Sequence, residues 1–285
     1  TNRIETVEYG KYSSLFWRQL SSREQSDIIA ASHRRFMARA DSLREEGFVA
    51  SVVFGTGPSI EQCNRWDFSR CYRHVCNTTI LDRTLMEYIR PHFISAADVV
   101  SHTGVSTYAH RYRQELISYL KSNDVFLLTT ATHGFRLFCE MPDVRDKILL
   151  CAQTTDDPVF DLYSDWRLPR LDSVLNILMF PAAATFADTI YILGADGKSP
   201  DASKNEDFWA HSTRTQLHNL VGSGHKTHPT FDLNRQNSTH DRYLVSCEKT
   251  IRVGENSFGK RYISLAPSFT PVIGERFIDI EPSRL

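Results

Sequence analysis

Stretches with the composition of buried strands alternate with stretches of helical periodicity along most of this 285-residue chain. β-Branched and aromatic residues are frequent in the first kind, and apolar residues recur every three or four positions in the second. This alternation predicts an α/β fold with a mostly parallel, Rossmann-like sheet and helices on both faces. Strands are expected at 49–54, 72–76, 97–101, 124–130, 147–151, 188–193 and 261–265. Helices are expected at 59–64, 81–89, 107–122, 133–139, 171–186 and 238–256.

The region before the first strand has its own pattern. Ser21 and Glu24 have the spacing of a capping box, and an apolar stripe follows, which predicts an amphipathic helix over 21–46. We therefore expect residues 1–47 to form an N-terminal helical segment or linker, which would join further domains of a longer chain. Residues 48–285 are expected to form one Rossmann-like domain.

The junction "SVVFGTGPSIEQC", residues 51–63, connects the first strand to its helix through two glycines. Gly55 and Gly57 allow another group to approach the backbone closely, Pro58 fixes φ, and Ser59 can cap the helix. Free N–H groups at such a helix N-terminus predict an anion site, most often for phosphate. The missing Gly-Lys-Ser/Thr triplet excludes a P-loop, and the missing third glycine excludes the dinucleotide fingerprint. An ordinary tight turn is the alternative.

Polar residues follow two further strands. Asn77 offers both a donor and an acceptor, which suits a base or a ribose, although a turn residue that starts a helix fits the position equally well. Gly194, Asp196 and Gly197 come directly after the apolar run "IYIL". Groups beyond the carboxyl ends of parallel strands are the usual ligand site in this architecture, and an Asp-Gly turn is the alternative here.

Histidines cluster late in the chain, at His211, His225 and His228. A neutral imidazole can serve as a general base near pH 7. The alternative for each histidine is a surface or turn position, and we favour it for His211 and His225 when the residues are considered singly.

The same region raises the question of a metal. The spacing H-x-x-H can place two imidazoles on one ion, with Asp232 or His240 as a third ligand, but it matches no standard zinc motif. Asp156 and Asp157 are adjacent rather than spaced, so in an extended chain their carboxylates diverge, and a solvated loop is the better interpretation. We therefore expect no metal site.

Composition excludes some classes of protein. The 33 Lys and Arg nearly balance the 34 Asp and Glu, which argues against a general nucleic-acid binder. The six cysteines contain no C-x-x-C pair, which favours buried, reduced thiols. No signal peptide or membrane-spanning run is visible, so we expect a cytoplasmic protein, with peripheral attachment at the inner membrane as the second location.

Five features of the chain together resemble the bacterial sialyltransferase-type superfamily. In chain order they are strand–"GTGPS"–helix, strand–Asn77, "IYILGADG", a late histidine and "YISLAPSFTP". That superfamily includes CMP-sialic-acid-dependent sialyltransferases, motility accessory factors and 6-hydroxymethylpterin diphosphokinase-like proteins. The strongest local match is Gly55-x-Gly57-Pro58-Ser59, and the resemblance covers roughly residues 49–275. The region from "DGKSP" to "GKRYISLAPS" is similar to members of this superfamily that are encoded among surface-polysaccharide genes, for capsule or lipopolysaccharide.

The resemblance implies a glycosyltransferase that moves a sugar from a nucleotide-activated donor to a glycan or glycolipid acceptor. It implies an inverting, metal-independent reaction without a cofactor, with His228 as general base, His225 as the second candidate and Asp196 at the pocket floor. The residues that the resemblance places at the donor are Gly55, Thr56, Gly57, Pro58, Ser59, Asn77, Ser173, Gly194, Gly197 and Ser268.

One departure from the family pattern concerns the leaving group. The sialyltransferases usually carry tyrosines soon after the "G-x-D" strand end to help the departing phosphate, and this chain has Phe208 and Trp209 there. The donor is therefore either CMP-sialic-acid-like or another nucleotide sugar. Two alternatives remain, a diphosphokinase-like phosphotransferase, which would need magnesium held by carboxylates, and a non-catalytic nucleotide-binding module.

Overall fold

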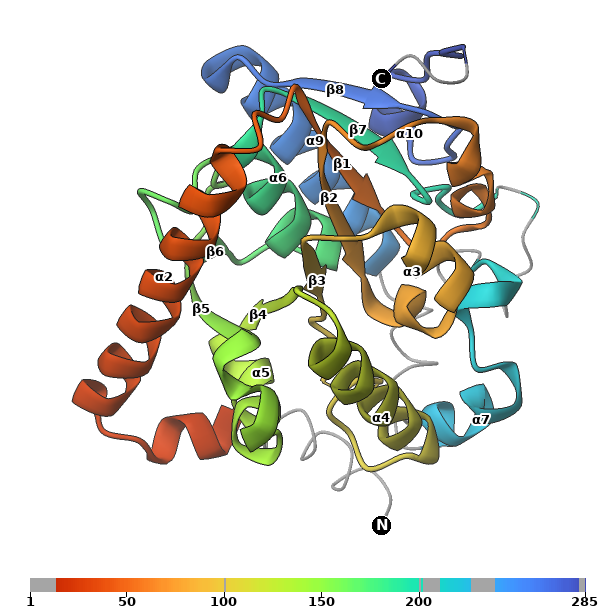
Figure 1. Ribbon diagram of the computed structural model, residues 1–285. Coiled ribbons are helices and arrows are strands. Elements are labelled where there is room, and N and C mark those ends of the chain that lie inside the picture. Colours follow the sequence, from red (N-terminus) through yellow and green to blue (C-terminus); the bar gives the residue numbers. More distant parts are fainter. Residues whose placement is uncertain (1–13, 100, 200, 202–210, 227–238, 282–284) are drawn as a thin grey trace.

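The computed structural model describes residues 14–99, 101–199, 201, 211–226, 239–281 and 285. One sheet of eight strands forms the centre of this part of the chain, in the order β6-β5-β4-β3-β2-β1-β7-β8 (Figure 1). Every neighbouring pair is parallel, so the carboxyl ends of all strands lie along one edge. The strands are β1 (Ala50–Phe54), β2 (Cys71–Cys76), β3 (Phe93–Ser95), β4 (Phe126–Thr130), β5 (Ile148–Thr155), β6 (Arg167–Pro169), β7 (Thr189–Leu193) and β8 (Arg261–Ser264). The predicted α/β fold is confirmed.

Helices cover both faces of the sheet. One face carries η1 (Pro58–Arg65), η2 (Asn77–Leu81), α3 (Arg83–Ile89), α4 (Thr107–Ser122), α5 (Ala131–Glu140) and η3 (Pro142–Lys147). The other carries α2 (Ser22–Arg44), η4 (Leu175–Met179), α6 (Phe180–Phe186), α9 (Thr239–Phe258) and α10 (Pro271–Gly274). The short η5 (Thr213–Thr215) packs against η2, and α7 (His218–Lys226) packs against α4. No helix in the described ranges has the length and apolar character that a membrane crossing requires.

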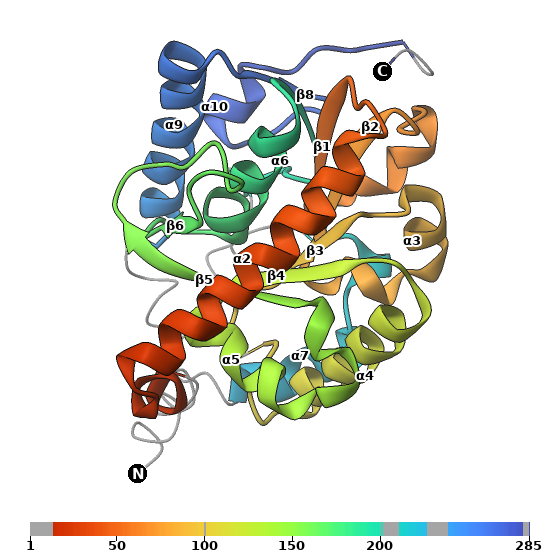
Figure 2. The same cartoon turned by 60° about the vertical axis from the view of Figure 1, so that its left-hand side comes forward.

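The long helix α2 packs on the sheet and runs obliquely across its strands (Figure 2). The predicted capping box is present, since the Ser21 side chain accepts the Glu24 N–H and Glu24 accepts the Ser21 N–H at 2.7 Å. Phe36, Ala40 and Leu43 are fully buried in the apolar layer shared with α6 and α9. The described part of the expected N-terminal segment thus lies against the sheet, while the division at residue 48 stays a prediction.

Two predicted elements differ from the structure. The strand expected at 97–101 lies earlier, as β3 (Phe93–Ser95), because Phe93 and Ile94 are buried between β2 and β4 while Asp98 is exposed. The helix expected over 171–186 begins only after Ser173 and consists of the π-helix η4 followed by α6. Both differences occur at the carboxyl edge of the sheet, where the chain forms irregular loops.

The cysteines are all free thiols, as expected, and no disulfide links them. Five of them are buried, and Cys139 near the end of α5 is exposed. Burial was therefore predicted correctly for five of the six.

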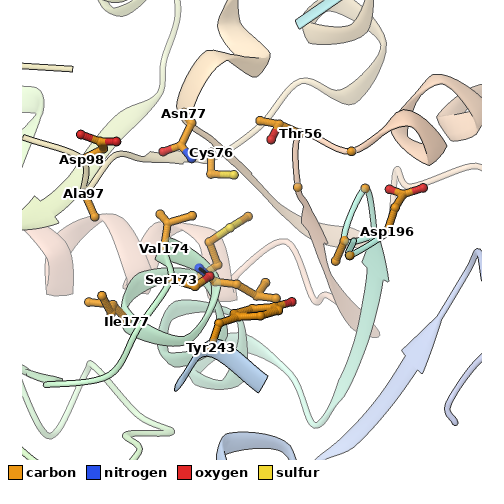
Figure 3. A pocket seen from close by; sticks show the side chains of 17 residues that line it. Thr56, Cys76, Asn77, Ala97, Asp98, Ser173, Val174, Ile177, Asp196 and Tyr243 are labelled. Atoms are coloured by element: carbon orange, nitrogen blue, oxygen red, sulfur yellow. Dashed lines mark hydrogen bonds between the residues drawn. The ribbon is translucent and has the colours of Figure 1, made fainter. Parts of the chain in front are cut away.

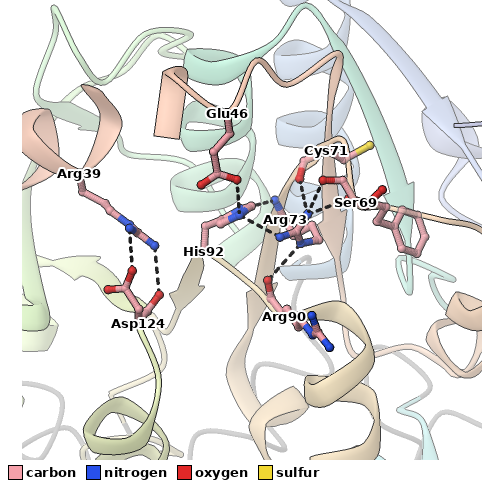
Figure 4. A network of polar contacts seen from close by, with 9 residues as sticks. Arg39, Glu46, Ser69, Cys71, Arg73, Arg90, His92 and Asp124 are labelled. Carbon is pink, nitrogen blue, oxygen red and sulfur yellow. Dashed lines mark hydrogen bonds and ion pairs between the residues drawn. The ribbon is translucent and has the colours of Figure 1, made fainter. Parts of the chain in front are cut away.

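A polar network lies near the amino ends of β2 and β3 (Figure 4). The Arg73 guanidinium donates to the carbonyl oxygens of Phe68 at 2.8 Å, Cys71 at 2.9 Å and Arg90 at 3.0 Å. His92 Nδ1 accepts the Arg73 backbone N–H at 3.0 Å. These bonds join the turn before β2 to the turn before β3, so they fix the edge of the sheet opposite the carboxyl ends.

A second buried histidine lies inside the sheet. His74 is fully buried, with Nε2 at 2.7 Å from Ser95 Oγ and Nδ1 at 3.1 Å from the Tyr72 hydroxyl. Burial lowers the pKa of His74 from its ordinary 6.5 to about 3, because a charged imidazole would be held away from water. The side chain is therefore neutral in the folded protein at neutral pH.

We expect this neutral histidine to make the fold sensitive to acid. As pH falls below 6.5, the unfolded chain protonates at residue 74 while the folded protein does not, so the free energy of unfolding falls with pH. His74 alone should remove roughly 2 kcal/mol between pH 6.5 and pH 5. Urea unfolding of the wild type and of His74→Gln at both pH values measures this loss, and the variant should show the smaller change between the two pH values. An equal free energy of unfolding at the two pH values would contradict the prediction.

Candidate functional site

The candidate site lies where the order of the strands reverses. From β1 the chain proceeds to β2 on one side, whereas β7 joins β1 on the other side. The loops that leave the carboxyl ends of β1 and β7 therefore separate at this edge. In open parallel sheets, ligands bind in the crevice at such a switch point.

Hydrogen bonds hold the loops after β1 and β7 together. The Gly55 N–H donates to Leu193 O at 2.8 Å, and the Gly57 N–H donates to Gly194 O at 2.8 Å. The Asp196 carboxylate accepts the Ser59 N–H at 3.0 Å and the Ser59 hydroxyl at 2.9 Å. The loop at 55–59 is thus part of a rigid two-loop junction.

The glycines of this junction are required by the protein itself. A Cβ at Gly55 would overlap the Gly194 carbonyl, and a Cβ at Gly57 would overlap the Asp196 carboxylate. Gly194 has φ +78, and a Cβ there would lie 2.5 Å from Gly55 O. Only glycine permits this backbone-to-backbone contact.

These contacts correct the prediction of free N–H groups in the "GTGPS" loop. The N–H groups of Gly55, Gly57 and Ser59 are all bonded within the protein, so they are not available to a phosphate. Both oxygens of Asp196 accept hydrogen bonds from Ser59, so its carboxylate helps to hold the junction together. Burial raises the pKa of the Asp196 carboxyl, and the bonds from Ser59 act in the opposite direction.

Beside the junction is a cavity of about 360 Å³, in the size range of small-molecule sites (Figure 3). Its walls come from the ends of β1, β2, β3 and β7, from the segment 173–179 and from α9. Of the predicted residues, the lining includes Gly55, Thr56, Gly57, Asn77, Ser173, Gly194, Asp196 and Gly197. Segments far apart in the sequence therefore meet around one space, as expected for a site beyond the carboxyl ends of the strands.

Two of the polar residues in this lining have unusual backbone conformations. Asn77 has φ 50 and Ser173 has φ 77, and Arg90 is the remaining non-glycine residue with positive φ in the described ranges. Positive φ is disfavoured for residues with a Cβ and gathers at functional sites. Asn77 Oδ1 is also buried without a hydrogen-bond partner among the described residues. A buried acceptor without a partner is costly unless a ligand or water satisfies it.

Irregular backbone continues after Ser173. Residues Leu175–Met179 form a π-helix, a rare conformation that often occurs at functional sites. Leu175, Ile177 and Met179 supply an apolar wall of the cavity. Ser173 Oγ accepts the Leu175 N–H at 3.2 Å, which leaves the hydroxyl proton of Ser173 to donate.

Other predicted residues lie behind the lining or outside the described part. Pro58 begins η1, Ser59 is 6% exposed, and the Ser268 hydroxyl donates to Ala195 O at 2.6 Å. His225 belongs to α7, but its side chain is not among those described, and His228 lies outside the described residues. Phe208, Trp209 and Asp232 also lie outside them.

Among the lining residues that were not predicted, Asp98 and Tyr243 have side chains with oxygen atoms that can form hydrogen bonds. Asp98 is exposed at the cavity, and its carboxylate accepts the Ser101 N–H and hydroxyl at 2.9 and 3.0 Å. Tyr243 of α9 also lines the cavity, and its hydroxyl lies 3.0 Å from Thr270 Oγ1. Asp98 lies within a stretch that was expected to be a strand, and Tyr243 occupies an ordinary apolar position of an expected helix. The sequence therefore did not indicate that either residue lines a site.

In the described ranges, no three His, Cys, Asp or Glu side chains lie together as a metal site would need. Asp156 and Asp157 are exposed, with Lys249 Nζ at 3.1 Å from Asp157 Oδ1, as expected for a solvated loop.

No protein-family model matches the chain, and no curated protein matches its sequence. Among solved structures, the chain is similar to the Campylobacter jejuni sialyltransferase CstII in complex with the substrate analogue CMP-3FNeuAc. The sequence identity is 12%, the TM-score is 0.46, and the match covers 84% of this chain and 90% of that chain. It is also similar to the monofunctional alpha-2,3-sialyltransferase Cst-I from the same organism, with 12% identity, a TM-score of 0.46 and 84% of each chain covered. Because the sequence identities and TM-scores are this low, the proposed function rests on the cavity and not on these similarities.

Proposed function

We propose that the protein is a glycosyltransferase that moves a sugar from a nucleotide-activated donor to a glycan or glycolipid acceptor. The observation that carries the proposal is the cavity at the switch point of the sheet, where Asn77 and Ser173 are held with positive φ. In this proposal the cavity binds the nucleotide of the donor. Surface-polysaccharide synthesis is the proposed setting, and the cytoplasm or the inner-membrane surface is the proposed location.

The chemistry of the lining suits a nucleotide. Asn77 presents an amide with a buried oxygen that lacks a partner among the described residues, and a base or ribose can supply the missing donor. The hydroxyls of Ser173 and Thr56 lie around the same space (Figure 3) and can donate to phosphate oxygens. The apolar wall of η4 suits the face of a base or sugar.

We propose a late-loop histidine as the general base, His228 first and His225 second. Described residues before and after this loop lie beside or at the cavity, which supports this assignment. Before it, the Ser212 N–H donates to Thr56 O at 2.7 Å, and after it, Tyr243 lines the cavity. A base that takes the acceptor's hydroxyl proton would assist an inverting transfer.

Asp196 is proposed as a positioning residue. Because its carboxylate holds the Ser59 N–H and hydroxyl, it would act on the donor through the shape of the loop at 55–57. Hydroxyl and amide groups, rather than a metal, would then stabilise the departing phosphate.

The two alternatives predict different behaviour. A diphosphokinase-like phosphotransferase would need magnesium to shield its phosphates, and a non-catalytic module would bind a nucleotide without turning over a donor. The test is release of free nucleotide from CMP-, UDP- and GDP-sugars, with glycan acceptors, in EDTA and in magnesium. Release that continues in EDTA is expected, whereas activity restored only by magnesium would favour the phosphotransferase. Binding without release would favour the module.

A single substitution tests the role of Asn77. We expect Asn77→Gly to weaken nucleotide binding at least tenfold, because it removes the amide while glycine keeps the left-handed backbone without strain. The melting temperature without ligand should change little, so the thermal shift produced by nucleotide reports on binding alone. Asn64→Ala, at an exposed position of η1, is the matched control. An unchanged nucleotide shift in Asn77→Gly would exclude the amide from the site.

A further inference from the structure

A second cavity, of about 760 Å³, opens at the same edge of the sheet, beyond β5. It lies between the start of α2, the start of α5, the end of β5 and the chain that follows β6. Trp17 forms part of its wall and packs edge-on against Phe135, with ring centroids 5.3 Å apart. The volume is in the range of ligand sites.

Neutral hydrogen-bonding groups dominate the polar part of this lining. The hydroxyls are those of Ser22, Ser26, Thr132 and Thr154, and the amides are those of Gln25 and Gln153. Arg170 is the one charged side chain among the described lining residues. Many uncharged donors and acceptors beside one cation fit a ligand with many hydroxyls and an acidic group.

The two amides are held in place. Gln25 Nε2 donates to Trp17 O at 3.0 Å and to Leu20 O at 3.1 Å, so its oxygen is the group left to accept from a ligand. Gln153 Nε2 donates to Pro169 O at 3.2 Å. Fixed side chains lose little freedom when a ligand binds, which favours affinity.

Arg170 can reach a ligand at little cost. Its side chain is 58% exposed and pairs at 3.3 Å with Asp156, which is itself 79% exposed. Such exposed ion pairs contribute little stability, so the guanidinium can exchange Asp156 for a carboxylate of a ligand.

The two cavities are neighbours. Leu171 lines the second cavity and Ser173 lines the first, and two residues of chain span at most about 7 Å. The cavities are also close at the start of α5. Thr132 lines the second cavity, and the adjacent His133 has Nδ1 at 2.9 Å from the carbonyl oxygen of Ala97. Ala97 lines the first cavity. A chain-like ligand in the second cavity could therefore place its end in the first.

We infer that the second cavity binds an acidic oligosaccharide, with Arg170 as the partner of its carboxylate. The further statement that this oligosaccharide is the acceptor rests on the proposed function. The site would hold the body of the acceptor chain, while the hydroxyl at its end enters the donor cavity.

The test is isothermal titration of the full chain with the trisaccharide of galacturonic acid and with the matched neutral trisaccharide of galactose. We expect the acidic probe to bind more tightly, and Arg170→Ala to weaken it roughly tenfold or more. Arg167→Ala is the matched control, because Arg167 is 56% exposed, pairs with Asp165 and does not line either cavity. Gln153→Ala should weaken both probes.

The outcomes separate this inference from the proposed function. Absence of binding by both probes, or equal losses in Arg170→Ala and Arg167→Ala, would overturn the inference. Nucleotide binding measured in the same samples reports on the donor cavity alone. If the acidic probe binds as expected but no nucleotide does, the saccharide site stands and the proposed function fails.

Discussion

Replacing His228 by alanine is expected to lower the rate of sugar transfer by roughly 10²- to 10⁴-fold, the usual contribution of general base catalysis. Pro229 follows this histidine and favours an extended backbone at residue 228, which would hold the ring in one direction. Donor affinity should change little. The acidic limb of the rate–pH profile should disappear, because that limb reports protonation of the base.

His225→Ala is the matched variant, and we expect a much smaller effect from it. If His225→Ala lowers the rate and His228→Ala does not, then His225 is the base and the rest of the proposal holds. If neither variant changes the rate or its pH profile, the late loop has no catalytic role. The non-catalytic binding module would then become the better explanation.

Gly57→Val is expected to destabilise the fold rather than only to block a ligand. A sequence-based prediction is that this variant folds but loses nucleotide binding, because the new side chain would fill the space of a phosphate. In the structure the new Cβ would overlap the Asp196 carboxylate and lie 2.8 Å from Gly194 O. We therefore expect a loss of at least roughly 3 kcal/mol in the free energy of unfolding.

Gly222→Ala is the control for this prediction. Gly222 lies in α7, where a Cβ would meet nothing within 4 Å, so alanine should leave stability unchanged or raise it slightly. Urea unfolding of the two variants and of the wild type measures these changes in the free energy of unfolding. A Gly57→Val variant as stable as the wild type would show that the two-loop junction can open at no cost.

Much of the fold was predictable because strands buried on both faces have a clear composition. Runs such as Ala50–Phe54 and Thr189–Leu193 are apolar and β-branched, and each is followed by a turn signal. The helix expected over 107–122 is present with the same bounds, because Ser106 caps it and its apolar stripe is regular.

Short elements were harder to predict from the sequence. β6 has three residues, Arg167–Pro169, and only its neighbour β5 gives it a strand conformation. α7 contains two glycines and five polar or charged residues, so its helical form depends on packing against α4 rather than on propensity. In both cases tertiary contact decides the local structure, and a sequence pattern does not record it.

The site was predictable in location but not in detail. The glycines after β1 and β7 indicated a site at the carboxyl ends of these strands, because each group of glycines follows a clear strand. Their partner was not predictable: Gly57 faces Asp196, which is 139 positions away in the chain, instead of a phosphate. Similarly, no sequence pattern indicates that Asn77 and Ser173 have positive φ, since the surrounding structure imposes that conformation.

Titration of CMP, UDP, GDP and ATP into the wild type and into Ala97→Phe tests the central claim most directly. Ala97 lines the donor cavity (Figure 3), and a phenyl ring there would fill space that the nucleotide needs. We predict that at least one nucleotide binds the wild type and that Ala97→Phe, folded as judged by circular dichroism, loses at least tenfold in affinity. Absence of binding by all four nucleotides, or equal affinity in the two proteins, would contradict the assignment of this cavity to a nucleotide-sugar donor.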